Sequence, residues 1–463
     1  MYRRAALSLA ISSLIAILGC GSALSRSGSS GTTTPPSSAP PSSGSLNSVN
    51  HIVFLFQENR SFDNYFGHFN PYRTSVGLAA DADDLTSPSI PLAANPTFDG
   101  STCSGSPSGT CTPFKMVSAC IGDLTPGWNE SHTERNNSAP ASSSATMDGF
   151  AYQAGAYAAN NGLPDHAGAR AMGYYDQSTL NYYYYLATQF ATSDRWFSPI
   201  MAKSEPNHLY SFAATSQGWI DIPNTQLDAN TIFNVLQNAG ISWKIYYTDQ
   251  TPAGKPDTYA SYFSKLNSLS SNIVPLSQYF TDLQNGTLPA VALIDAGRDS
   301  GTDEHPNNNV QVGAQQAQKV INALMSSSSW SSSVFLLTWD EAGGTYDHVP
   351  PLTTVNPDGI APNPAPFPYI KSTFNDNFTY TGFRVPLIVV SPFAKKGYIS
   401  HAPADYTAIL KLIETRFGLG HLTARDAAQP DMSDFFDFSA PNATPPTPPN
   451  QSVSAPCYYD RVP

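Results

Sequence analysis

The chain has 463 residues, a formal net charge of −12 and charged residues at only 13% of its length. Such a length is ample for one large domain with a buried site. A chain with a net negative charge and so few charged residues is not expected to have a basic surface that binds a polyphosphate. We therefore expect no nucleic acid partner.

The first 20 residues follow the pattern of a bacterial export signal, with two arginines, an apolar stretch and a small residue before Cys20. The sequence ILGC at residues 17–20 resembles a lipobox, in which the cysteine is acylated after cleavage. Ordinary cleavage near Ala23, which would release an unanchored protein, is the alternative. Residues 21–48 are rich in Ser, Thr, Pro and Gly, which predicts a flexible linker because they offer little apolar surface to bury. We therefore expect an exported protein that is tethered to the outer membrane or cell surface through Cys20, or is secreted or periplasmic.

Four further cysteines allow three disulfide pairings in an oxidising compartment. Cys103 and Cys111 lie in one short loop rich in Gly, Ser and Pro, so we predict that they pair with each other. Cys120 would then pair with Cys457 and fasten the tail, residues 440–463, to the body of the protein. Beyond the signal, no hydrophobic stretch of the sequence is long enough to span a bilayer.

Strands and helices are predicted to alternate along the chain. Short apolar runs, too short for helices and without polar alternation, predict strands covered on both faces at residues 52–56, 291–294, 334–339 and 385–390. Helical patterns occupy residues 231–240, 310–325 and 405–420. This order predicts an α/β fold with a mostly parallel central sheet flanked by helices. Polar, Pro-rich loops at about 81–120 and 356–378 are expected to form a smaller loop-rich cap at the rim of the site.

Polar residues follow two of these strands directly. The first strand is followed by Glu58 and Asn59, and the strand at 334–339 by Asp340 and Glu341. Ligands of open α/β sheets bind beyond the carboxyl ends of the strands. Adjacent carboxylates repel each other unless they are solvated, protonated or neutralised by a cation. A metal ion is the economical explanation, and a solvated turn is the alternative.

A serine near the start of another helical pattern is a third candidate. Pro206 lies near the beginning of the pattern in FSPIMAKSEPNHLYSFAATS, so Ser204 falls at or just before the first turn. Its hydroxyl could cap the helix, which is the commoner role of such a serine. It could instead act as a nucleophile, because free N–H groups and the helix dipole attract phosphate oxygens.

Six short motifs occur in one order along the chain. They are ENRSFDNYFG (58–67), MDGF (147–150), MGYYD (172–176), SEPNH (204–208), EHP (304–306) and DEAGGTYDHVPP (340–351). Together they resemble the bacterial phosphoesterase family, which contains phosphatidylcholine-cleaving phospholipases C and an acid phosphatase. The resemblance spans about residues 49–438 and implies a catalytic domain at 49–439 with an alkaline-phosphatase-like fold. It also implies a hydroxyl nucleophile that is coordinated by metal and forms a covalent phosphoenzyme.

Matched to the family motifs, Glu58, Asn59, Asp340 and Glu341 would be metal ligands, and Ser204 would be the nucleophile and a further ligand. An oxygen-dominated set suits Ca²⁺, Mg²⁺ or Mn²⁺. Zinc also accepts carboxylates, so the sequence leaves the identity of the divalent ion open.

Three histidines are assigned to the site with different support. His305 in EHP and His132 in DLTPGWNESHTERN match active-site histidines of the resembled family. His348 in YDHV could either hold the loop that carries Asp340 or contact the site. Such histidines would protonate the leaving alkoxide and later activate the water that cleaves phosphoserine.

Three positions depart from the motifs of the resembled family. Pro126 stands where a histidine is usual, His208 replaces the arginine of the common P-N-R, and Tyr406 replaces the histidine of D-H-T. We expect these changes to affect substrate preference more than the basic chemistry. At the nucleophile position the family's phospholipases C tend to carry threonine and the acid phosphatase carries serine, so Ser204 favours the phosphatase.

The sequence thus predicts a metal-dependent phosphoesterase that acts on phosphate esters through phosphoserine, like the acid phosphatase. One alternative is a phospholipase C that releases phosphorylated headgroups from phospholipids. The tyrosines at 181–186 could meet lipid or choline through cation–π contacts, although such stripes more often pack in a core. The other alternative is a non-catalytic, surface-anchored binding protein, against which the complete ligand set argues.

Overall fold

The computed structural model describes residues 45–363 and 376–459, all within one unit that spans residues 43–463. The predicted signal peptide, Cys20 and the linker up to residue 44 lie outside the described residues. The same holds for residues 364–375 of one predicted rim loop and for the last four residues of the tail.

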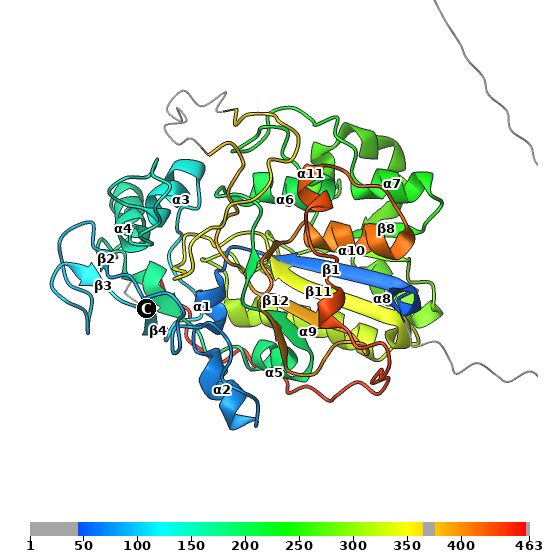
Figure 1. Cartoon of the computed structure of the whole chain (residues 1–463), viewed down its shortest axis with the longest axis horizontal. Coiled ribbons are helices and arrows are strands. Elements are labelled where there is room, and N and C mark those ends of the chain that lie inside the picture. Colours follow the sequence, from blue (N-terminus) through cyan, green and yellow to red (C-terminus); the bar gives the residue numbers. More distant parts are fainter. Residues whose placement is uncertain (1–44, 364–375, 460–463) are drawn as a thin grey trace, which may run out of the picture. The chain divides into compact units, whose positions relative to one another are not determined.

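Within the described residues, an eight-stranded sheet forms the centre of the molecule (Figure 1). In sheet order its strands are β13 (Tyr398–Ser400), β6 (Ala191–Ser193), β12 (Leu387–Val390), β11 (Ser333–Trp339), β1 (His51–Gln57), β10 (Val291–Asp295), β8 (Trp243–Tyr247) and β9 (Ile273–Pro275). β12 runs antiparallel to both of its neighbours, and the other adjacent pairs are parallel. The predicted α/β fold with a mostly parallel sheet is therefore confirmed, and the four predicted strands are present as β1, β10, β11 and β12.

Parallel pairing brings three strand ends to one edge of the sheet. Phe56 of β1 pairs with Asp295 of β10 on one side and with Thr338 of β11 on the other. Because these strands run in the same direction, the residues that follow them emerge together. Glu58 and Asp340 are thus delivered to the same edge as Asp295.

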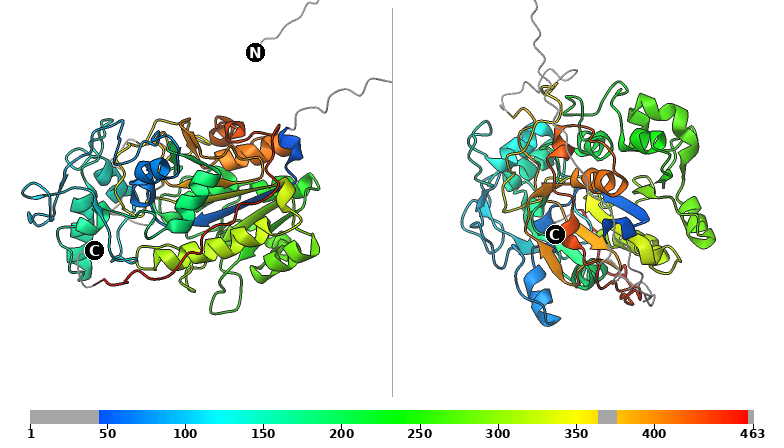
Figure 2. Two further views of the ribbon diagram at one scale, coloured as in Figure 1. Left: turned by 90° about the horizontal axis from the view of Figure 1, so that it is seen from below. Right: turned by 45° about the vertical axis from the view of Figure 1, so that its right-hand side comes forward.

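Helices cover both faces of this sheet. They are α1 (Phe62–Phe66), α2 (Phe69–Ser75), α3 (Trp128–Arg135), α4 (Phe150–Asn161), α5 (Asn181–Gln189), α6 (Ser204–Ala213), α7 (Ile232–Asn238), α8 (Ser277–Asn285), α9 (Val310–Met325), α10 (Ala408–Phe417) and α11 (Ala424–Ala427). α9 contacts α5 and α8, whereas α10 contacts α6, and Figure 2 shows α9 and α10 on opposite faces of the sheet. The predicted helices are present as α7, α9 and α10, and α10 ends at Gly418 in the left-handed conformation that glycine adopts without strain.

A smaller, loop-rich region lies at one end of the sheet (Figure 1). It contains α3, α4 and two small sheets, built from β2 (Asn95–Pro96) with β3 (Thr110–Cys111) and from β4 (Phe114–Lys115) with β5 (Gly173–Tyr174). A further two-stranded sheet pairs β7 (Trp196–Phe197) with β14 (Ala404–Asp405).

The C-terminal tail is fastened to the body as expected. Disulfides join Cys103 to Cys111 and Cys120 to Cys457, which confirms both predicted pairings. The tail runs along α9 (Figure 2), where the amide of Gln318 donates to the carbonyl of Pro449 at 2.7 Å.

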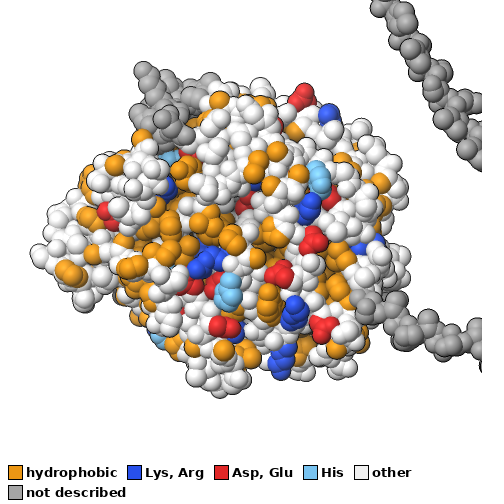
Figure 3. All heavy atoms as spheres, in the orientation of Figure 1, with side chains coloured by type: hydrophobic (Ala, Val, Ile, Leu, Met, Phe, Trp, Pro, Cys, Tyr) orange, Lys and Arg blue, Asp and Glu red, His pale blue; other side chains and the backbone are white. Residues whose placement is uncertain are grey.

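Three of the four tyrosines of α5 pack in the core, and Tyr185 is half-buried. Tyr182, Tyr183 and Tyr184 are fully buried, so these rings do not face lipid or choline. Tyr183 donates a hydrogen bond to the carboxylate of Glu304 at 2.7 Å. No helix in the described part of the chain is long and apolar enough to cross a membrane. Among the described residues on the face in Figure 3, lysine and arginine side chains lie scattered between neutral and hydrophobic ones.

Candidate active site

The hydroxyl of Ser204 points to the end of β1 and does not cap its helix. α6 begins at Ser204, and the capping position is taken by Lys203, whose side chain makes no capping hydrogen bond. The Ser204 Oγ instead donates to Glu58 Oε2 at 3.1 Å and accepts from Asn59 Nδ2 at 2.9 Å. A buried hydroxyl at the first turn of α6 thus joins the residues that follow β1.

The five predicted metal ligands come together around the amide of Asn59. Its Nδ2 lies 3.4 Å from Glu58 Oε2, 3.2 Å from Asp340 Oδ2 and 2.5 Å from Glu341 Oε1. The backbone N–H of Asn59 also donates to Asp340 Oδ1 at 2.8 Å. The backbone of Asn59 is left-handed, with φ 64°, which asparagine tolerates better than most residues. The turns after β1 and β11 and the start of α6 thus bring these five residues together.

The three carboxylates are buried without a balancing lysine or arginine. These three residues are at most 5% exposed, and burial raises the pKa of Glu58, of Asp340 to about 8, and of Glu341 well above its ordinary value. After burial, the charge of Glu58 is the largest influence on Asp340. Among the described residues no lysine or arginine forms an ion pair with any of the three, and the basic side chains near them are His208 and His305. Such a donor set fits a divalent cation, which would supply the missing positive charge.

His208 belongs to this cluster, although the sequence showed it only as a departure from a motif. Its Nε2 lies 3.0 Å from Glu58 Oε1 and 3.8 Å from Asp340 Oδ2. Burial lowers the pKa of His208. The signal that could have placed it is its spacing of four residues from Ser204, which puts both side chains on one face of α6.

His305 also reaches the cluster. Its Nε2 is 3.7 Å from Glu58 Oε2, and its Nδ1 is 2.6 Å from Asp303 Oδ2. Burial opposes the charged form, but the carboxylates of Glu58 and Asp303 outweigh it and raise the pKa of His305 to about 9. Arg60 fixes this loop by donating to the carbonyl of Glu304 at 2.8 Å. In the metal-free site the imidazole of His305 therefore favours its protonated form.

His348 lies in a second buried network. Its Nδ1 is 2.7 Å from Asp63 Oδ2 and its Nε2 is 3.3 Å from Asp83 Oδ1. Arg384 donates to Asp63 Oδ1 at 2.9 Å and to Asp347 Oδ1 at 2.8 Å. Burial lowers the pKa of His348, but Asp63 and its neighbours raise it to about 9. These contacts correspond to the first of its two expected roles, holding the loop that follows β11.

His132 lies on α3, in a different pocket. Its Nδ1 is 2.7 Å from the carbonyl oxygen of Trp128, and its Nε2 is 3.3 Å from Asp376 Oδ2. Arg135 and Tyr380 line the same pocket. These contacts join His132 to the cap and the loop before β12, whereas His305 and His208 touch Glu58.

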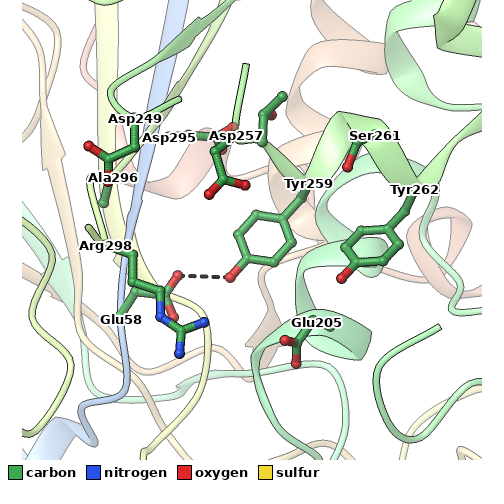
Figure 4. A pocket seen from close by; sticks show the side chains of 11 residues that line it. Glu58, Glu205, Asp249, Asp257, Tyr259, Ser261, Tyr262, Asp295, Ala296 and Arg298 are labelled. Atoms are coloured by element: carbon green, nitrogen blue, oxygen red, sulfur yellow. Dashed lines mark hydrogen bonds between the residues drawn. The ribbon is translucent and has the colours of Figure 1, made fainter. Parts of the chain in front are cut away.

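A second pocket, acidic and aromatic, opens beside Glu58. Tyr259 donates its hydroxyl hydrogen to Glu58 Oε1 at 3.2 Å, and Figure 4 shows Tyr262 and Glu205 beside it. The pocket is also lined by Asp249, Asp257, Asp295 and Arg298. Asp295 is 5% exposed, and its Oδ2 has no hydrogen-bond partner in the described part of the chain. Sequence reasoning missed this pocket because most of its lining, including Asp249, Asp257, Tyr259 and Arg298, lies outside the motifs that the sequence showed.

The chain belongs to the phosphoesterase family, whose model matches residues 49–420. The protein is therefore a hydrolase that acts on phosphoric ester bonds, as the sequence predicted.

Relatives of this chain carry phospholipase C names. It is 29% identical to phospholipase C B of Mycobacterium tuberculosis over 87% of this chain and 80% of the relative. It is 30% identical to non-specific phospholipase C4 of Arabidopsis thaliana over 82% of this chain and 70% of that protein. A solved protein in the alkaline phosphatase superfamily from Vibrio parahaemolyticus aligns with 54% of this chain and 64% of that chain, at 12% identity and a TM-score of 0.33.

Replacing Asp340 by asparagine should stabilise the metal-free protein by roughly 2–4 °C in melting temperature, because it removes one of three buried like charges. Asp340 binds its proton with a pKa of about 8, against an ordinary value of 3.8. Stability linked to this proton is complete below about pH 4 and is lost as the pH rises through about 8. Metal-free wild type should therefore melt at a lower temperature at pH 9 than at pH 5, and Asp340→Asn should lessen that difference.

Thermal unfolding of chelated protein, followed by circular dichroism, measures both effects. Adding a divalent cation should raise the melting temperature of wild type but not of Asp340→Asn. Identical melting temperatures, pH dependence and cation response in the two proteins would contradict the interpretation of this cluster.

Proposed function

We propose that this chain is a metal-dependent phosphoesterase in which Ser204 carries the phosphoryl group as phosphoserine. The observation that carries the proposal is the direct contact of the Ser204 hydroxyl with Glu58 and Asn59, in a cluster that Asp340 and Glu341 complete. Membership of the phosphoesterase family supports it.

A divalent cation held by Glu58, Asn59, Asp340 and Glu341 would lower the pKa of the Ser204 hydroxyl and withdraw charge from the phosphoryl group. Ca²⁺, Mg²⁺, Mn²⁺ and Zn²⁺ all accept carboxylate oxygens.

In the first half of the proposed reaction, Ser204 Oγ forms a bond to phosphorus and gives its proton to Glu58, to which it already donates. The bond from phosphorus to the leaving oxygen breaks, and that oxygen keeps the electron pair. His305, cationic beside Glu58, supplies the proton that the leaving oxygen takes up.

In the second half, neutral His305 accepts a proton from water as the water oxygen bonds to phosphorus. The bond from phosphorus to Ser204 Oγ breaks, and Ser204 recovers its proton from Glu58. We propose supporting roles for the other two histidines. His348 would hold the loop after β11 through Asp63, and His132 would shape the pocket on the cap side.

Two classes of substrate are proposed. Serine at the nucleophile position favours phosphomonoesters, as for the acid phosphatase of the family. The phospholipase C names of the relatives and the pocket beside Glu58 favour a phospholipid with a cationic headgroup. In that pocket the ring of Tyr262 and the carboxylates of Asp257 and Glu205 suit an ammonium group, and acidic side chains outnumber Arg298.

The proposed location rests on the sequence alone. We propose that the protein is exported and that Cys20 carries the lipid anchor, which would hold the catalytic domain close to a membrane surface.

Mass spectrometry of detergent-extracted protein from the producing cell tests the anchor. The mature chain should begin at Cys20 and carry an added diacylglyceryl mass. An unmodified amino terminus near residue 24 would show that the ordinary cleavage near Ala23 is the correct alternative.

Replacing Ser204 by alanine should lower kcat for p-nitrophenyl phosphate by roughly a thousandfold or more, because the attacking oxygen is removed. Acid quenching of wild type during turnover should trap phosphoserine at residue 204. Ser277→Ala is the matched control, since Ser277 is likewise the first residue of a helix, α8, but is exposed and away from the cluster. Full activity of the Ser204→Ala enzyme would refute the phosphoserine mechanism.

Replacing Tyr262 by alanine should raise KM for p-nitrophenylphosphorylcholine about fivefold, the effect of losing a cation–π contact of about 1 kcal/mol. KM for p-nitrophenyl phosphate should stay unchanged, and Tyr262→Phe, which keeps the ring, should behave as wild type. Release of phosphocholine from phosphatidylcholine vesicles by wild type separates the two substrate classes. Cleavage of the monoester alone would reject the phospholipase C candidate.

A further inference from the structure

We propose that His208 is a nitrogen ligand of the metal ion, so that the site selects zinc-like transition metal ions over Ca²⁺ and Mg²⁺. The inference rests on the metal site of the proposed function, and adds to it a ligand outside the set that the family motifs supply. Imidazole suits zinc and similar ions, whereas an all-oxygen site suits Ca²⁺, Mg²⁺ and Mn²⁺.

The distances are those of atoms that can share one ion. The Nε2 of His208 lies 3.0 Å from Glu58 Oε1 and 3.8 Å from Asp340 Oδ2, and one ligand atom from each residue lies within 4.8 Å of the others. Zinc bonds to nitrogen and oxygen are about 2.0–2.2 Å long, so two ligands of one ion are about 3–4 Å apart. The three side chains therefore need little movement to bind a common cation.

The imidazole is fixed in this orientation by its surroundings. Its ring stacks on Tyr259, with 3.6 Å between ring centroids and 12° between the planes, and meets the edge of Phe56 at 5.6 Å. Tyr259 also donates to Glu58 Oε1, so one aromatic side chain holds both members of the pair. A ligand held in place in advance loses little conformational entropy when the ion binds.

The residue type at position 208 also favours a metal ligand. His208 stands where the common P-N-R motif has arginine, a side chain with a permanent charge and no lone pair for a metal. Histidine has no permanent charge, and in its neutral form its ring offers a lone pair beside Glu58 and Asp340. The buried carboxylates then depend more strongly on a bound ion for their balance.

A simpler role must be separated from this one. His208 could act only as a hydrogen-bond donor that positions Glu58, and His305 is a second imidazole close to the same carboxylate. His305 is the weaker candidate for a ligand, because Glu58, Asp340 and His208 each offer an atom within 4.8 Å of the others, and His305 is not in that group among the described residues. The contact of its Nδ1 with Asp303 also suits a metal ligand, so the experiment has to separate the two histidines. Glutamine at either position keeps an amide for hydrogen bonding but loses the imidazole nitrogen.

Pulsed electron paramagnetic resonance of the Mn²⁺-loaded protein detects a directly bound ¹⁴N. The signal should be present in wild type and in His305→Gln, and absent in His208→Gln. Calorimetric titration should show that His208→Gln weakens zinc binding by roughly tenfold to a hundredfold or more, with a smaller effect on Ca²⁺.

Each other outcome overturns the inference in a recognisable way. A nitrogen signal that disappears in His305→Gln but persists in His208→Gln assigns the ligand to His305. Wild type that binds the ion without a nitrogen signal has an all-oxygen site, and the proposed phosphoesterase mechanism then still stands. Wild type that binds no divalent ion removes the basis of both proposals. If His208→Gln does not fold, the wild-type spectrum tests for nitrogen and His305→Gln assigns it by elimination.

Discussion

The burial of three like charges at the end of β1 and β11 is the constraint on which the site depends. Glu58, Asp340 and Glu341 approach one another only because two parallel strands end at the same edge and Asn59 donates to all three. This approach requires unusual backbone. Asn59 is left-handed, and a Cβ at Gly343 would lie 2.2 Å from the carbonyl oxygen of Asn59. Position 343 therefore requires glycine, because a side chain there would keep the turns after β1 and β11 apart.

In a second acidic cluster next to the first, positively charged side chains balance the buried carboxylates. Asp63 and Asp347 are as deeply buried as the residues of the site, but Arg384 forms ion pairs with both and His348 adds a further positive charge. Charge in this network is balanced by side chains, so it can stiffen the turns after β1 and β11. The cluster around Asn59 has no arginine or lysine partner among the described residues, and this contrast marks it as the one that needs an ion.

The sequence predicted the parts of the site that depend only on residues adjacent along the chain. Glu58 and Asn59, like the acidic pair after β11, sit beside the strand that positions them, so a strand pattern was enough to place them. The stacking of His208 on Tyr259 could not be predicted, because it depends on how α6 packs against a segment about 50 residues away in the sequence. Residue type likewise does not tell which buried carboxylate a histidine will face, and His132 lies 3.3 Å from Asp376.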